Sequence, residues 1–221
     1  MRLPGLGGWS EDPLWGSFYD WTVEHPRIGG ALWAAGIQSD LRLLYAAASE
    51  IGRQRAGARV LDVPCGGGVA VRALRPDQGV DYVAVDISQR MLDRTARVAR
   101  ECGVAEQVTP RPADVEQLPF GDRSFDLVVS FTGLHCFPDP ARAVVELCRV
   151  LELGGVLTGS ALLNDTGLRF EPMRRVGRLA GLLGPGCTSD QLQRWLARQG
   201  VSDVVLDVSG PLAYFRGVRR A

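Results

Sequence analysis

The chain has 221 residues, the size of one domain with an additional segment. Its 25 basic and 25 acidic residues cancel, which argues against a nucleic-acid or membrane-surface protein, because such proteins usually carry a basic excess. Lysine is absent and the only histidines are His25 and His135. The sequence therefore excludes a lysine nucleophile, a lysine base and a histidine-rich metal site.

Five cysteines are scattered along the chain without a Cys-x-x-Cys spacing, a pattern typical of reduced thiols. The sequence contains no apolar run of the roughly 18 residues that a membrane span needs. The first residues lack the apolar region of a signal peptide. These features predict a cytoplasmic protein without stable membrane insertion, and they leave open whether it is a monomer or a homodimer.

Residues 1–57 are rich in aromatic side chains and are predicted to form a helical lid. Apolar residues at a spacing close to 3.6 predict a helix over Ala31–Ile51, although Gly36 is unfavourable inside it. The aromatic residues are expected either to wall an apolar or aromatic ligand or simply to cover the sheet. They are Trp15, Phe18, Tyr19, Trp21 and Trp33.

Between residues 58 and 161, short apolar runs alternate with helical stretches. Strands are predicted at Arg59–Val63, Asp81–Val85, Gln107–Arg111, Phe125–Ser130 and Val156–Leu162. Helices are predicted at Val69–Leu74, from the cap Ser88 to Arg100, and at Pro140–Leu151 behind the cap Asp139. Strands that alternate with helices in this way indicate a parallel sheet with helices on both faces.

The alternation stops after residue 161. Residues 162–190 are predicted to form a lid insertion, whose basic stretch Arg169–Arg178 is either a solvated mobile face or a contact for an anionic substrate or acidic membrane. Residues 191–221 complete the fold with the end of a helix predicted at Ser189–Gln199 and with strands at Val204–Val208 and Ala213–Val218. The turn between these strands is too short for a parallel crossover, which predicts an antiparallel hairpin.

The whole chain, residues 1–221, is thus predicted to be a single α/β domain. We expect a Rossmann-like, seven-stranded, mostly parallel sheet with a C-terminal antiparallel hairpin, helices on both faces and a helical lid.

The segment VLDVPCGGG (Val60–Gly68) combines a strand that ends in an acid with a glycine turn. Glycines let a backbone approach a ligand closely. Asp86 ends the second predicted strand, at the distance at which an acid grips ribose hydroxyls, and Asp114 follows the third. The dinucleotide fingerprint Gly-x-Gly-x-x-Gly is absent, and the carboxylate of Asp62 would repel a pyrophosphate. Three acids at successive strand ends fit an adenosine that carries an amino acid better than they fit phosphates.

This arrangement resembles the class I S-adenosylmethionine-dependent methyltransferases, and within them the small-molecule branch that includes quinone-biosynthesis C-methyltransferases. The resemblance covers about residues 58–160 through five segments in family order: LDVPCGGG, AVDIS, ADVEQLPF, SFDLVVSFTGLHCFPDP and RVLELGGVL. Pro64 stands where the family usually has its first glycine, and Glu152-Leu153 replaces a basic-proline pair. The resemblance implies S-adenosyl-L-methionine as cofactor and S-adenosyl-L-homocysteine as product.

The resemblance also implies a role for each matching residue. Asp62 organises the loop and binds the methionine amino group directly or through water, Asp86 binds the ribose hydroxyls, and Asp114 binds the adenine amine. The other residues implied to contact the cofactor are Tyr19 in an N-terminal lid, Pro64, Gly66, Gly68, Ile87, Met91, Val115 and the carbonyl of Ser130.

His135 follows the fourth predicted strand, where an acceptor would meet the methyl group, so it is the candidate general base. A packing or cofactor-contacting role is the alternative, and His25 is a second candidate base. Methyl transfer does not always need a base, since alignment of the acceptor with an activated methyl group supplies much of the rate.

The predicted function is transfer of a methyl group to an oxygen or carbon of a small, apolar or aromatic acceptor, without a nucleic-acid partner or a metal. Two alternatives stay open. One is an NAD(P)-binding reductase, and the other is a non-catalytic binding module with the methyltransferase fold.

Overall fold

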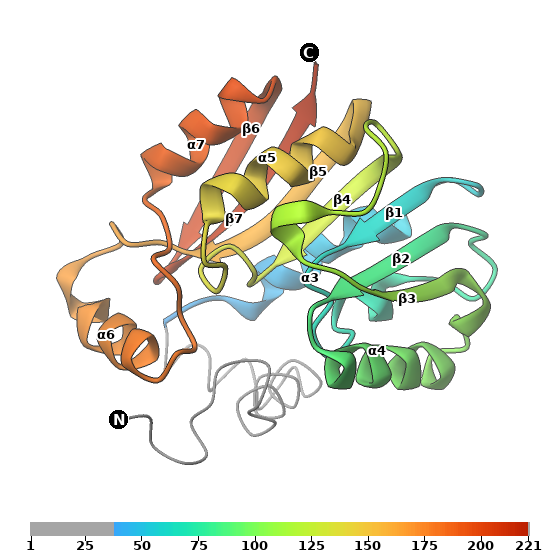
Figure 1. Ribbon diagram of the computed structural model, residues 1–221, viewed down its shortest axis with the longest axis horizontal. Helices are drawn as coiled ribbons and strands as arrows, with labels where there is room; N and C mark the ends of the chain where they lie inside the picture. The colour runs from blue at the N-terminus through green and yellow to red at the C-terminus, as the bar shows by residue number, and fades with distance from the viewer. Residues whose placement is uncertain (1–37, 221) are drawn as a thin grey trace.

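A computed structural model describes residues 38–220, which build one seven-stranded sheet with helices on both of its faces (Figure 1). The strands lie in the order β3-β2-β1-β4-β5-β7-β6. They are β1 Arg59–Asp62, β2 Asp81–Asp86, β3 Val108–Pro112, β4 Phe125–Phe131, β5 Leu151–Leu162, β6 Val201–Ser209 and β7 Leu212–Arg219. Strands β1 to β5 pair in parallel, whereas β7 lies between β5 and β6 and pairs antiparallel with both. The predicted Rossmann-like α/β fold with its antiparallel hairpin is confirmed.

Two apolar clusters, one on each face of the sheet, hold four of the five helices of residues 38–220. The helices are α3 Leu41–Gly52, α4 Gln89–Glu101, α5 Pro140–Val150, α6 Glu171–Leu179 and α7 Ser189–Arg198. Helices α3 and α4 pack on one face, and α5 and α7 pack on the other, in front of the sheet in Figure 1. Because β4 is covered on both faces, Leu127, Val128 and Val129 are all completely buried. This explains the continuous apolar run in its sequence.

The helix predicted at Ala31–Ile51 is shorter than expected in the described residues. Residues 38–40 are not helical, and α3 begins at Leu41. The Asp40 carboxylate is its N-cap and accepts a hydrogen bond from the Arg42 N–H at 2.9 Å. Within the described residues, the predicted continuous helix is interrupted at residues 38–40, because this cap begins the first turn of α3 at Leu41. The earlier part of the prediction lies outside the described residues.

The prediction of an α-helix at Val69–Leu74 is wrong, because only a short 3₁₀ helix, η1 (Ala70–Ala73), follows the glycine loop. Pro76 disfavours a helical conformation at the residue before it, and three glycines precede the segment. Too few residues remain between them to build a stable α-helix. The glycine loop therefore leads into a tight turn and not onto the N-terminus of a long helix.

The segment 162–190 contains α6, and its basic stretch is less solvated than the sequence suggested. The Arg174 guanidinium is buried and donates to the carbonyls of Leu163 and Gly167 at 3.1 and 3.0 Å. It also pairs with Glu171 at 3.0 Å. Arg175 remains exposed, as expected for a solvated face. Arg174 thus ties α6 to the chain that leaves β5.

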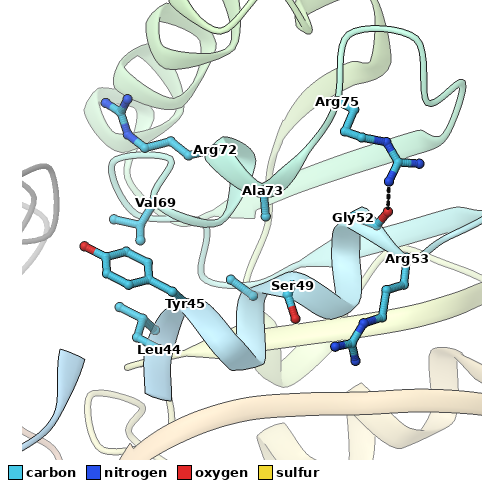
Figure 2. Close-up of a pocket in the computed structure, with 10 residues that line it drawn as sticks. Leu44, Tyr45, Ser49, Gly52, Arg53, Val69, Arg72, Ala73 and Arg75 are labelled. Carbon is cyan, nitrogen blue, oxygen red and sulfur yellow. Dashed lines mark hydrogen bonds between the residues drawn. The ribbon is translucent and has the colours of Figure 1, made fainter. Parts of the chain in front are cut away.

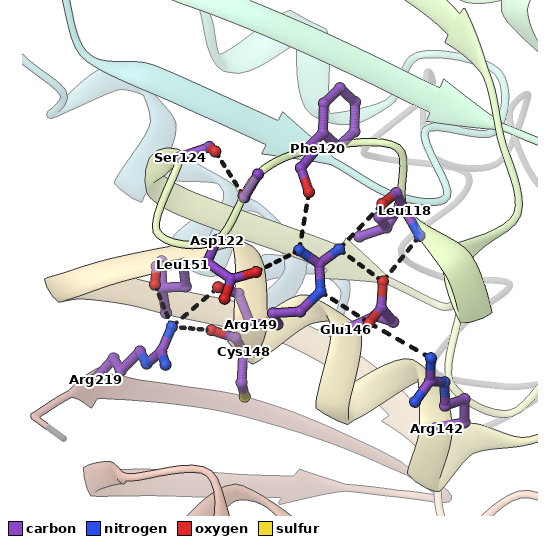
Figure 3. A network of polar contacts seen from close by, with 11 residues as sticks. Leu118, Phe120, Asp122, Ser124, Arg142, Glu146, Cys148, Arg149, Leu151 and Arg219 are labelled. Atoms are coloured by element: carbon purple, nitrogen blue, oxygen red, sulfur yellow. Dashed lines mark hydrogen bonds and ion pairs between the residues drawn. The ribbon is translucent and has the colours of Figure 1, made fainter.

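A polar network at the amino ends of β4 and β5 joins the 118–124 loop to α5 (Figure 3). Arg149 pairs with Glu146 at 2.8 Å and with Asp122 at 2.8 Å, and it donates to the Phe120 carbonyl. Glu146 accepts from the buried Leu118 N–H, and the hydrogen bond from Arg149 lowers the pKa of this carboxyl. The network fixes the loop that enters β4 at the edge opposite the glycine loop.

Candidate functional site

The loops after β1 and β4 diverge at the centre of the sheet. The chain leaves β1 toward β2 and β3, whereas β4 leads to β5 on the other side. In open parallel sheets, ligands bind at the carboxyl ends of the strands at such a switch point. The two loops touch here, since a Cβ on Gly133 would lie 2.4 Å from the Pro64 ring. The structure thus brings the glycine loop and the Ser130–His135 segment together.

Asp86 ends β2 beside the glycine loop and holds the loop in place. Its carboxylate accepts the Gly66 N–H at 3.1 Å and the Ser88 N–H at 2.9 Å. Burial raises the pKa of Asp86, and the backbone hydrogen bonds from Ser88 and Gly66 oppose that shift. The carboxylate is therefore fixed by two backbone donors at the place where a ribose is expected.

Asp62 ends β1 and lies beneath the same loop, with 1 % of its surface exposed. Its Oδ2 accepts a hydrogen bond from the hydroxyl of buried Tyr82 at 2.7 Å. Burial raises the pKa of Asp62 to about 7, the Tyr82 hydrogen bond opposes that shift, and the Asp86 charge adds to it. Sequence reasoning missed Tyr82. It lies on the same sheet face as Asp86 because side chains alternate along β2, which is the signal that would have found it.

The two glycines of the predicted motif have different surroundings. Gly66 has φ +51°, and no atom lies within 4 Å of where its Cβ would be, so a ligand has room to approach. Gly68 has φ +88°, and its Cβ would lie 3.0 Å from the Cα of Thr95 in α4. Gly68 therefore allows close packing of the loop on a helix, whereas Gly66 faces open space.

The residues predicted around the adenine lie after β2 and β3. Ile87 is 69 % exposed at the end of β2, while Met91 in α4 and Val115 are buried. Asp114 is exposed and caps a short 3₁₀ turn, where it accepts the Glu116 N–H at 2.9 Å. An exposed apolar side chain beside a buried carboxylate suits an adenosine. The hydrogen bond from the Ala113 N–H to the Asp86 carbonyl at 3.3 Å links the two segments.

Beyond β4 the backbone is tightly constrained. Ser130 is completely buried, and its hydroxyl has no hydrogen-bond partner among the described residues. A Cβ on Gly159 in β5 would lie 2.3 Å from the Ser130 carbonyl, so only glycine fits there. Thr132 has φ +54°, which is rare for a β-branched residue. Strain of this kind gathers at functional sites, where surrounding contacts maintain it.

His135 lies next to this loop, but its hydrogen bond does not favour the predicted general base. The Nδ1 atom accepts the Leu162 N–H at 3.0 Å, so in the neutral ring the proton is on Nε2. Burial lowers the pKa of His135 to about 4. Because the Nδ1 lone pair already accepts a hydrogen bond, the neutral ring can act only as a donor, through its Nε2–H group. His135 therefore connects the site to β5.

The structure also contains a groove of about 490 Å³ between α3 and η1 (Figure 2). Its floor is apolar and its rim carries arginine side chains. The lining includes Leu44, Ala48, Val69, Ala73, Arg53, Arg72 and Arg75. None of the residues predicted to bind the cofactor lines it. We therefore assign the candidate site to the strand ends and not to this groove.

Tyr19 and His25 lie outside the described residues. Within residues 38–220, no cluster of three or more histidine, cysteine or acidic side chains is arranged to hold a metal ion. The same residues include no helix with the length and apolar character of a membrane span.

Comparisons with known proteins agree with this geometry. Residues 61–158 match the family model described as a methyltransferase domain. The 27-O-demethylrifamycin SV methyltransferase of Amycolatopsis mediterranei is 34% identical over 129 residues, which cover 56% of this chain and 47% of that protein. The 2-methyl-6-phytyl-1,4-hydroquinone methyltransferase 2 of Oryza sativa subsp. japonica, a chloroplastic protein, is 33% identical, over 73% of this chain and 44% of its own. The chain thus spans less than half of the length of both relatives.

Solved structures share the fold. The phosphoethanolamine N-methyltransferase 2 of Haemonchus contortus, in complex with S-adenosyl-L-methionine, superimposes with a TM-score of 0.70 at 15% identity and covers 93% of this chain and 57% of its own. The resemblance inferred from the sequence is confirmed. Over residues 61–158 the chain therefore resembles the class I S-adenosylmethionine-dependent methyltransferases.

Proposed function

We propose that the protein transfers the methyl group of S-adenosyl-L-methionine to a small acceptor and releases S-adenosyl-L-homocysteine. The observation that carries this proposal is the cluster of carboxylates around the glycine loop: Asp62 and Asp86 are buried at adjacent strand ends, and Asp86 fixes Gly66. An adenosine with an amino-acid tail needs acceptors at two ends, and this cluster supplies them. The names of the relatives support the same reaction.

The cofactor supplies a methyl group that is already activated by a positively charged sulfur. In our proposal Asp86 binds the ribose hydroxyls, Asp62 binds the methionine amino group, and Asp114 with Ile87 holds the adenine. Tyr19 closes over the cofactor, and five further groups line it: Pro64, Gly66, Met91, Val115 and the Ser130 carbonyl. Gly68 supports the loop through α4. The protein's main contribution is then alignment of acceptor and methyl group in a site that excludes water.

We propose that the acceptor is small and apolar or aromatic, and that an oxygen or a carbon atom receives the methyl group. The rifamycin and hydroquinone methyltransferases among the relatives are named for acceptors of this kind. The absence of a basic excess in the sequence argues against a nucleic acid as acceptor. A monomer and a homodimer are both compatible with this function.

Calorimetry tests the proposal directly. We expect S-adenosyl-L-homocysteine to bind with a micromolar Kd and NAD(P) to show no binding. Tight NAD(P) binding without S-adenosyl-L-homocysteine binding would support the reductase instead. Cofactor binding without methyl transfer to a panel of phenols, hydroquinones and macrolactams would favour the non-catalytic module.

A further inference from the structure

The contact between Asp62 and Tyr82 is more specific than the fold requires. Both residues are almost wholly buried, and the Tyr82 hydroxyl uses its one proton on Asp62 Oδ2 at 2.7 Å. The neighbouring strand positions on this face are apolar, as at Val60 and Ala84. A phenylalanine would fill the same space in the core. The hydroxyl therefore serves the carboxyl group and not the packing.

We infer that Tyr82 is a positioning residue for the cofactor: its hydroxyl fixes the Asp62 carboxyl, which binds the methionine amino group and releases its own proton to solvent as it does so. This inference rests on the proposed function, since it assigns a partner and a protonation change to the same site. In the step, the carboxyl O–H bond breaks, the proton goes to water, and the ammonium group of the ligand takes its place beside the carboxylate.

The charge environment explains why a proton is held until the ligand arrives. Asp62 faces Tyr82 and Asp86 from β2 and Cys65 from the glycine loop, and none of these groups supplies a positive charge. Burial and the Asp86 charge both favour the neutral carboxyl, and burial also raises the pKa of Tyr82 well above its usual value. An ammonium group is the missing positive partner, and it stabilises the ionised carboxylate.

The test is the pH dependence of ligand affinity, measured by calorimetry. Binding of S-adenosyl-L-homocysteine to the wild type should weaken by about tenfold between pH 7.5 and pH 6, and about one proton should be released per ligand at pH 6, as seen from buffers of different ionisation enthalpy. Methylthioadenosine shares the nucleoside and the sulfur but has no amino group, so its affinity should be flat over this range.

The Tyr82→Phe variant should move the pH profile for S-adenosyl-L-homocysteine upward by about one pH unit, because it removes the hydrogen bond that favours the carboxylate. Tyr214→Phe is the matched control, since Tyr214 is a buried tyrosine of the same sheet face in β7. It should leave the profile unchanged.

A flat wild-type profile with tight binding, or identical profiles for wild type and Tyr82→Phe, would overturn the inference alone. Absence of binding by the wild type at every pH would instead overturn the proposed function, and this inference with it.

Discussion

At the scale of single residues, Asp86 is the side chain that joins the loop to the expected ligand. It accepts two backbone N–H groups, yet each carboxylate oxygen has a second lone pair for a ribose hydroxyl. We expect Asp86→Asn and Asp86→Ala to weaken S-adenosyl-L-homocysteine binding about tenfold or more, because charge-assisted hydrogen bonds worth roughly 1.5–3 kcal/mol are lost.

The control for Asp86 is Asp93→Asn, an exposed acid in α4, which should bind the ligand as the wild type does. Circular dichroism should show that the Asp86 variants remain folded. An unchanged affinity of folded Asp86→Asn would show that the ribose assignment is wrong.

The structure leads to a different prediction for His135 than its position in the sequence does. Removal of a general base typically lowers the rate by about 10²–10⁴-fold. Because the His135 Nδ1 accepts the Leu162 N–H, we expect His135→Ala to lower kcat by less than this and to lower the free energy of unfolding by about 1–3 kcal/mol.

Urea denaturation and steady-state kinetics of His135→Ala measure the two effects separately. Two results together would show that His135 is the general base after all. They are a wild-type kcat that decreases as the pH drops below 7, and a His135→Ala variant that is as stable as the wild type but about a hundredfold slower.

At the scale of elements, α6 depends on a buried charge. The Arg174 guanidinium satisfies the Leu163 and Gly167 carbonyls, which Arg174→Met would leave without their donor. We expect this variant to lose about 3 kcal/mol or more of stability locally, seen as faster chymotrypsin cleavage within residues 164–185.

Arg175→Met is the matched control, because Arg175 pairs with the same Glu171 but its side chain is 75% exposed. Its stability should change by no more than about 0.5 kcal/mol. Equal protease sensitivity of both variants would mean that the buried contacts do not hold α6.

The elements also show which signals in a sequence are reliable. The apolar run that became β4 and the Asp139 cap of α5 are specified locally, so they were predicted within a residue or two. The start of α3 and the 3₁₀ turn η1 were missed because a capping carboxylate and a downstream proline outweighed periodicity. The Tyr82 contact and the buried Arg174 depend on which strands and loops become neighbours, and periodicity does not carry that information.

At the scale of the whole molecule, two buried groups make opposite contributions to stability as the pH changes. His135 has a folded pKa of about 4, below its usual 6.5, so its contribution is lost as the pH falls through this range. Asp62 has a folded pKa of about 7, above its usual 3.8, so its contribution grows as the pH falls from 7. Between about pH 4.5 and 6.5 the contributions of His135 and Asp62 to the free energy of unfolding therefore change in opposite directions.

We therefore expect that a variant lacking one of these two groups will show the pH dependence of stability that the other group causes. Relative to wild type, Asp62→Asn should lose stability on acidification from pH 6.5, and His135→Ala should gain it, with slopes approaching about 1.4 kcal/mol per pH unit. Urea denaturation across this range measures both slopes. Parallel curves for the wild type and the two variants would contradict the assignment of these shifts.

The position of β7 has a consequence for the synthesis of the protein. Among the described strands β7 follows β6 in chain order, yet it lies between β5 and β6 and pairs with both. A ribosome therefore completes β5 and β6 before the strand that joins them has emerged. During that interval the outer edge of β5 has unpaired backbone groups, and such edges recruit other strands. The nascent chain is therefore exposed to misassembly at this edge of β5 until Leu212–Arg219 becomes available.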